Sequence, residues 1–119
     1  MPENRMPRPR RHGTVYSRRK GCTCEPCMDA ARDLQLRRRY GISIERYRQM
    51  MTNQDGRCNA CGLEWEGWEQ RFSVDHDHAT GNVRALLCQP CNLALGHVQD
   101  DPERLQLLID YLRRHSFGY

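Results

Sequence analysis

The sequence predicts a small α+β domain that depends on bound metal for part of its stability. The chain has 119 residues, 38% of them apolar, and a mean hydropathy of −0.90. A chain of this size buries only about two-thirds of its unfolded surface even with ordinary composition. Seven cysteines supply another source of stability, and helical and alternating apolar patterns both occur along the chain. No apolar run approaches the roughly 18 residues of a membrane span.

The N-terminal half is predicted to hold an arm followed by two helices. Residues 1–20 are rich in Arg and Pro, lack apolar periodicity and are expected to be extended or disordered. Residues 26–40 combine helix formers with a first-turn proline and the stop signal of Gly41. A second helix begins near Ser43, whose side chain can cap it, and ends at the Asp-Gly pair 55–56.

The C-terminal half mixes strand and helix patterns. A turn and a short strand are expected over 57–67, a strand over 71–76 and a turn over 79–82. Residues 83–98 have the apolar spacing of a helix, but Pro90 would break its interior, so either the helix starts near Pro90 or residues 88–91 form a separate metal turn. Residues 101–115 predict an amphipathic helix with an Asp N-cap, Pro102 at its first position and basic residues in its last turn.

Positive charge is concentrated at the N-terminus. Residues 1–40 carry eleven Lys and Arg against four Asp and Glu, a net +7, whereas residues 41–119 carry eight Arg against eleven Asp and Glu, a net −3. A basic arm of this kind favours an anionic polymer as partner, because neutralising phosphates releases counterions. A solvated tail is the alternative. The cations expected to contact DNA are Arg10, Arg11, Arg18, Arg19, Lys20 and, in the second half, Arg84.

Two Cys-x-x-Cys pairs predict a closed zinc site. Cys58 and Cys61 are separated from Cys88 and Cys91 by 26 residues, enough for a hairpin to leave and return. Four converging thiolates form the tetrahedron that structural zinc accepts, and zinc binding adds free energy of folding. The alternative is four unrelated cysteines in a reducing compartment. The absence of an apolar stretch behind the basic N-terminus predicts a cytoplasmic protein, where cysteines are first interpreted as metal ligands.

A second group lies between the cysteine pairs, at Asp75, His76, Asp77 and His78. Two imidazoles and two carboxylates in four residues point to divalent-cation binding or acid–base chemistry; an exposed loop whose polar residues have no chemical role is the alternative. Alternation would place the histidines and carboxylates on opposite faces, so a strand end or a bend is expected here. Asn92, directly after the last cysteine, could approach Asp75 because zinc holds both flanks of the hairpin.

Together, these residues and the run Thr80-Gly81-x-Val83-Arg84-x-Leu86-Leu87 resemble the phage recombination endonuclease VII family, which belongs to the zinc-bearing His-Me finger (HNH) nucleases. The resemblance covers about residues 58–97. It implies a ββα-metal fold, with Asp75 and His76 on the hairpin and Asn92 at the start of the helix. It also implies that Asp75 and Asn92 ligate a catalytic Mg²⁺ (with Mn²⁺ as a substitute), that His76 is the general base, and that His78 lies near the scissile phosphate.

The function implied is a Mg²⁺-dependent endonuclease that hydrolyses duplex or branched DNA to 5′-phosphate and 3′-hydroxyl ends, in a phage-encoded protein of the host cytoplasm. It is expected to act as a monomer or homodimer. One alternative is a zinc-ribbon DNA-binding or packaging accessory protein with weak or no nuclease activity. Another is a toxin-like nuclease that acts on RNA or on an invader's DNA.

Three further cysteines, Cys22, Cys24 and Cys27, lie close together and cannot all pair internally, which argues against a disulfide framework. With His12 they could form a second, Cys₃His zinc site; three free thiols at a helix entry are the alternative. The predicted organisation is therefore a basic arm over 1–21, a helical extension with this second site over 22–57, the nuclease core over 58–97 and a C-terminal helix over 98–119.

Overall fold

The computed structural model describes residue 9 and residues 11–65 and 71–116. The chain divides into two compact units, Met1–Met50 and Met51–Tyr119. No helix among these residues is long and apolar enough to cross a membrane.

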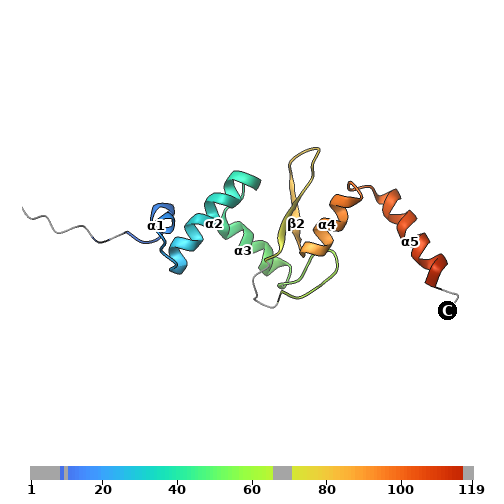
Figure 1. Ribbon diagram of the computed structural model, residues 1–119, viewed down its shortest axis with the longest axis horizontal. Helices are drawn as coiled ribbons and strands as arrows, with labels where there is room; N and C mark the ends of the chain where they lie inside the picture. Colours follow the sequence, from blue (N-terminus) through green and yellow to red (C-terminus); the bar gives the residue numbers. More distant parts are fainter. Residues whose placement is uncertain (1–8, 10, 66–70, 117–119) are drawn as a thin grey trace, which may run out of the picture. The chain divides into compact units, whose positions relative to one another are not determined.

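The first unit is built on helices α1 (Val15–Arg19) and α2 (Glu25–Tyr40), which pack against each other (Figure 1). Thr14 caps α1, because its Oγ1 accepts a hydrogen bond from the Ser17 amide at 3.1 Å. Residues 15–19 are thus helical, where the sequence led us to expect an extended or disordered arm. The Cys-rich segment that follows has fixed turns, and these turns hold residues 15–19 in a helix. Composition alone does not predict this effect.

Helices α2 and α3 lie where the sequence predicts them. Gly41 ends α2 in the left-handed conformation, at φ 72°. Helix α3 (Ile44–Asn53) begins in the first unit, and its free amides are capped twice. Ser43 Oγ accepts from the Arg46 amide at 3.0 Å, and Asp33 Oδ1 accepts from the Ile44 amide at 2.9 Å.

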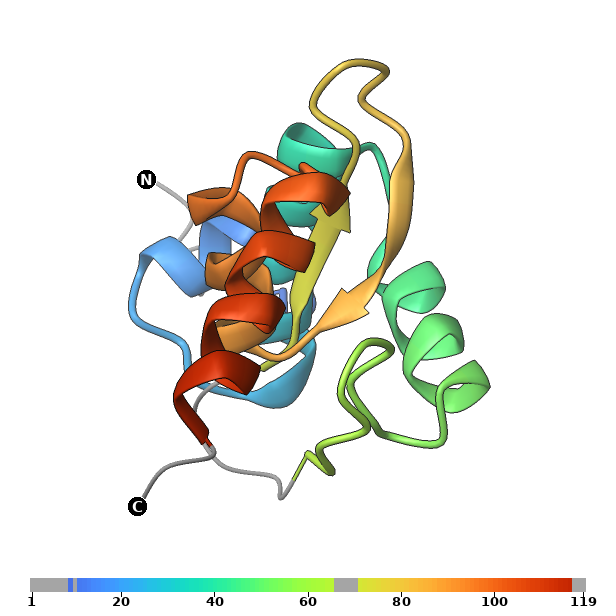
Figure 2. The same cartoon turned by 90° about the vertical axis from the view of Figure 1, so that its right-hand side faces the viewer.

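The second unit contains a two-stranded antiparallel sheet, β1 (Ser73–His76) and β2 (Val83–Leu87), joined by a hairpin turn (Figure 2). Helix α4 (Gln89–His97) follows β2 directly and packs against β1, and α5 (Pro102–Ser116) follows α4. The continuous helix expected over 83–98 is wrong in its first half. Residues 83–87 pair with β1, and the helix starts beside Pro90, as the first of our two alternatives had it.

The cores are small, and cysteines form part of them. Of the twelve buried apolar residues in the described chain, three are cysteines: Cys27, Cys58 and Cys88. The first unit buries Leu36, Ile44, Tyr47 and Met50 beside Cys27, and the second buries Phe72, Val74, Leu86, Leu87 and Val98. The predicted mixed helix-and-strand class is confirmed, with thiols occupying positions that aliphatic side chains fill in larger domains.

Candidate functional site

The four cysteines of the second unit converge on one point. The sulfur atoms of Cys58, Cys61, Cys88 and Cys91 all lie within 4.8 Å of one another. The first pair sits in a turn closed by the Cys58 amide on the Leu63 carbonyl at 2.8 Å and the Gly62 amide on the Cys58 carbonyl at 3.0 Å. The second pair opens α4, with Cys88 as its N-cap. This cluster, the C-cluster below, fits structural zinc as predicted.

The first unit holds a second cluster, which also fits structural zinc. His12, Cys22, Cys24 and Cys27 place one ligand atom each within 4.8 Å of the others. His12 Nδ1 lies 3.4 Å from the sulfurs of Cys22 and Cys24 and 3.8 Å from that of Cys27. This N-cluster confirms the expected grouping of three cysteines with a histidine.

Both clusters use the same local motif, Cys-x-Pro-Cys at the start of a helix. Cys24-Glu25-Pro26-Cys27 opens α2, and Cys88-Gln89-Pro90-Cys91 opens α4. The two N-cap cysteines have almost the same backbone angles, φ −64° and ψ 150° for Cys24 and φ −62° and ψ 156° for Cys88. A first-turn proline loses no helical hydrogen bond, so the motif places two thiols at a helix start at little cost.

One cysteine in each cluster has a pKa below that of an ordinary thiol. Burial raises the pKa of Cys27. Hydrogen bonds from the backbone N–H groups of Thr14 and Gly13, together with those to Cys24 and His12, outweigh burial and bring this pKa down to about 6. The Gly13 amide lies 3.3 Å from the Cys27 sulfur. In the C-cluster burial likewise opposes ionisation, yet the amides of Cys61 and Cys88 help bring the pKa of Cys58 to about 6. Amides that donate to sulfur favour the anion that binds zinc.

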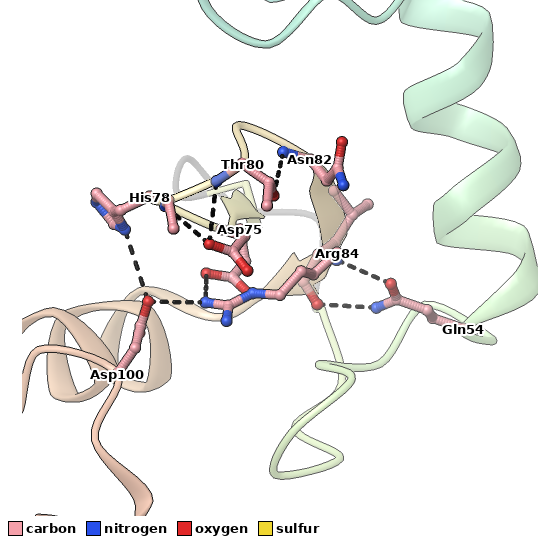
Figure 3. Close-up of polar contacts among 10 residues, drawn as sticks. Gln54, Asp75, His78, Thr80, Asn82, Arg84 and Asp100 are labelled. Atoms are coloured by element: carbon pink, nitrogen blue, oxygen red, sulfur yellow. Dashed lines mark hydrogen bonds and ion pairs between the residues drawn. The ribbon is translucent and has the colours of Figure 1, made fainter.

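A β-bulge shapes the acidic part of the site. Asp75 pairs with Ala85, whereas His76 pairs with Val83, so Arg84 is the extra residue of β2. The bulge brings the Arg84 guanidinium onto the Asp75 carboxylate in a bidentate pair, at 2.7 Å from Nε to Oδ2 and 3.0 Å from Nη2 to Oδ1 (Figure 3). Asp75 is only 7% exposed. The bend that the sequence predicts near these residues is this bulge.

Asp100, which sequence reasoning missed, joins the same network. Its Oδ2 lies 3.2 Å from Arg84 Nη2 and 3.6 Å from His78 Nδ1. Together the two carboxylates raise the pKa of Arg84, Asp75 more strongly than Asp100. Gln99 and Asp100 both have left-handed backbones, at φ 58° and 55°, and they line a cleft with His78 and Gly96. Strained residues of this kind mark places where the surrounding structure imposes a side-chain position.

Gln54 is a second residue that sequence reasoning missed. Its amide bonds both backbone groups of Leu86, donating to the carbonyl at 2.9 Å and accepting from the amide at 2.9 Å (Figure 3). It thereby pairs with β2 as a neighbouring strand would. The Asn59 amide also donates to the Leu86 carbonyl, at 3.1 Å, which ties the first cysteine turn to the strand.

The remaining predicted residues lie as follows. His76 ends β1 and its ring is 4.7 Å from that of His78, between centroids. His78 is exposed, in the hairpin turn, and Asn92 lies in the first turn of α4. Arg11, Arg19 and Lys20 are exposed and Arg18 is half-buried, whereas Arg10 lies outside the described residues.

Known proteins are similar to about two thirds of the chain. The profile of the recombination endonuclease VII family matches residues 33–114, well over half of the chain. The Gene 59 protein of Mycobacterium phage D29 is 50% identical over 76 residues, which are 63% of this chain and 46% of that protein. The Gene 59 protein of Mycobacterium phage L5 is 46% identical over 74 residues, 61% of this chain and 44% of the relative. The matched segment thus spans less than half of each curated relative. No solved structure matches the chain.

Proposed function

This chain belongs to the recombination endonuclease VII family, and from that premise we propose that it is a DNA endonuclease of the His-Me finger (HNH) type. In this proposal β1, β2 and α4 form a ββα-metal motif supported by the C-cluster. The observation that carries it is a buried carboxylate, Asp75, which is adjacent to His76 on β1 and lies opposite the bulge of β2, in the unit that holds the C-cluster. Burial of a carboxylate is costly unless it is paired, and Arg84 supplies a partner that still leaves lone pairs of Asp75 for a second cation.

The donors present fit a hard divalent cation. Asp75 supplies carboxylate oxygens, and Asn92 supplies an amide oxygen that makes no hydrogen bond to another described residue. Arg84 occupies one lone pair on each oxygen of Asp75, and a carboxylate offers about four such positions, so Arg84 and a cation can share it. Mg²⁺ (or Mn²⁺), when bound by Asp75 and Asn92, would stabilise negative charge on the phosphate and the leaving oxygen.

The side chains around Asp75 have distinct roles in the proposed reaction. His76 takes a proton from the attacking water, which a neutral imidazole can do near pH 7. His78, held by Asp100, lies near the scissile phosphate. Arg84 uses Nε and Nη2 on carboxylates, which leaves both N–H groups of Nη1 for a DNA phosphate. Water attack with departure of the 3′ oxygen gives 5′-phosphate and 3′-hydroxyl ends.

A plasmid-nicking assay tests the proposal. Zinc-loaded protein should convert supercoiled DNA to open-circle or linear forms with Mg²⁺ and not without it. We expect His76→Ala to slow cutting by about 10²- to 10⁴-fold, the usual contribution of a general base. His115→Ala, which removes an exposed histidine of α5, is the matched control and should cut like the wild type.

If His76→Ala kept full cutting activity, His76 would not be the general base. Absence of Mg²⁺-dependent cutting in the wild type would overturn the endonuclease proposal. If the wild type bound DNA without cutting it, the accessory DNA-binding function would take the place of the endonuclease proposal. If the wild type cut RNA and not DNA, the substrate would be RNA.

A further inference from the structure

We propose that the N-cluster and α1 form a phosphate-gripping module that docks this chain on DNA. The module comprises residues 11–27 and lies outside the segment that the family profile matches, which begins at residue 33. That the ligand is DNA rests on the function proposed above. That it is a polyanion rests on the module's own charge and geometry.

The module is held rigidly for its size. Ser17 is 1% exposed, and its hydroxyl donates to the Arg11 carbonyl. The Cys22 amide bonds the Ser17 carbonyl at 3.0 Å, and the Gly13 amide bonds the Cys27 sulfur at 3.3 Å. These bonds connect the His12 segment, α1 and the cysteine turn around the metal site. A helix of five residues could not hold its side chains in place without such bracing.

Its exposed surface carries positive charge without carboxylate partners. Arg11, Arg18, Arg19 and Lys20 form no ion pair with any residue in the described part of the chain. No Asp or Glu stands between Glu3 and Glu25 in the sequence. Two other arginines of the first unit do have carboxylate partners: Arg48 pairs with Asp29 at 2.9 Å and Arg37 with Asp33 at 2.8 Å. Four cations that have no carboxylate partner among the described residues form a surface suited to phosphates.

An aromatic ring lies on the same face as two of these cations. Tyr16 is 65% exposed, and Lys20 Nζ lies 5.6 Å from the centre of its ring. Positions 16, 19 and 20 share one side of a helix, and Ser17 faces the interior. An exposed tyrosine among cations can pack on a sugar or base edge while the cations hold the backbone. This combination favours a nucleic acid over a small anion or an acidic protein surface.

The test is DNA binding by the full zinc-loaded chain without Mg²⁺, so that no cutting occurs. Fluorescence anisotropy of a labelled duplex is followed over a range of salt concentrations. The test variant combines Arg18→Gln, Arg19→Gln and Lys20→Gln. The control combines Arg104→Gln, Arg113→Gln and Arg114→Gln, three exposed arginines of α5, and therefore carries the same change in net charge.

We expect the test variant to bind DNA on the order of tenfold more weakly. The slope of log K against log salt concentration should become shallower by up to about three, about one for each lost phosphate contact. The control should change affinity by less than about threefold. Cys22→Ser, which breaks the N-cluster, should weaken binding as the charge variant does. Equal weakening in test and control would show a general charge effect and overturn the module, as would unchanged binding in the test variant.

The two proposals fail separately. Loss of binding in the test variant, with no Mg²⁺-dependent cutting in the wild type, supports the module and rejects the nuclease. Normal cutting with unchanged binding in the test variant rejects the module alone. Tighter binding of a duplex RNA of the same length overturns the DNA assignment.

Discussion

At the scale of single residues, the Asp75–Arg84 pair is the most informative contact. Asp75 is nearly buried, so removal of Arg84 leaves a carboxylate that neither water nor a partner fully compensates. We expect Arg84→Ala to lower the free energy of unfolding by about 2 kcal/mol. Mg²⁺ should restore part of this loss, because a cation on Asp75 replaces the missing charge. Urea unfolding with and without Mg²⁺ measures both effects.

Arg57→Ala provides the matched control. Arg57 also pairs with a carboxylate, Glu64 at 2.6 Å, but both side chains are more than half exposed, at 52% and 64%. Exposed pairs contribute roughly 0–1 kcal/mol, so this variant should lose less stability and gain nothing specific from Mg²⁺. If Mg²⁺ stabilised both variants equally, or neither, Asp75 would not be the cation ligand.

Sequence reasoning selected residues whose roles depend on near neighbours and missed those whose roles depend on distant ones. The Cys-x-x-Cys pairs and Asp75-His76 are short-range patterns, and geometry brings both cysteine pairs together as predicted. Asp100 and Gln54 act through contacts that span 16 and 32 residues. An aspartate after a helix and a glutamine before a turn have no local feature that announces such contacts. Only the folded chain shows them.

At the scale of secondary structure, caps were better guides than apolar spacing. Gly41, Ser43 and the Asp101-Pro102 pair correctly placed the ends of α2, α3 and α5, because each satisfies or ends a set of backbone groups locally. The run Val83–Leu87 has apolar residues that suit either a helix or a buried strand. Its pairing with β1 and with the Gln54 amide decided for the strand, and neither partner is adjacent in sequence.

The start of α3 carries a pH prediction. The Ile44 amide, followed by Arg37, lowers the pKa of Asp33. A carboxylate whose pKa is lower in the folded state stabilises the fold above its unfolded value, near pH 4, and loses that contribution as pH falls through the folded pKa. We therefore expect Asp33→Asn to cost about 1 kcal/mol, by a constant amount from pH 8 to pH 5. Thermal or urea unfolding across that range measures it.

Asp29→Asn is the companion variant, because Asp29 contacts Arg48 at 2.9 Å in an exposed ion pair. It should cost under about 1 kcal/mol. A cost for Asp33→Asn that disappeared between pH 7 and pH 5 would contradict a lowered pKa. A cost no larger than that of Asp29→Asn would show that the charge of Asp33 adds nothing to its bond with the Ile44 amide.

At the scale of the whole molecule, the polar composition, the seven cysteines and the uneven charge have related explanations. Each unit has a small core that includes at least one cysteine of a cluster that fits zinc, so metal bound there would stabilise a fold that apolar burial alone leaves marginal. The net +7 of residues 1–40 includes the four cations of the N-cluster module, and the net −3 of residues 41–119 includes Asp75 and Asp100.

This organisation predicts two zinc ions per chain, each needed by its own unit. Elemental analysis should find two in the wild type and one in Cys22→Ser or in Cys61→Ser. Because ligands assemble only in the folded state, loss of a metal should release amide protection locally. In hydrogen exchange, Cys22→Ser should expose residues 14–40 and leave β1, β2 and α4 protected, whereas Cys61→Ser should do the reverse. A single zinc in the wild type, or uniform loss of protection in both variants, would contradict a chain built of two metal-braced units.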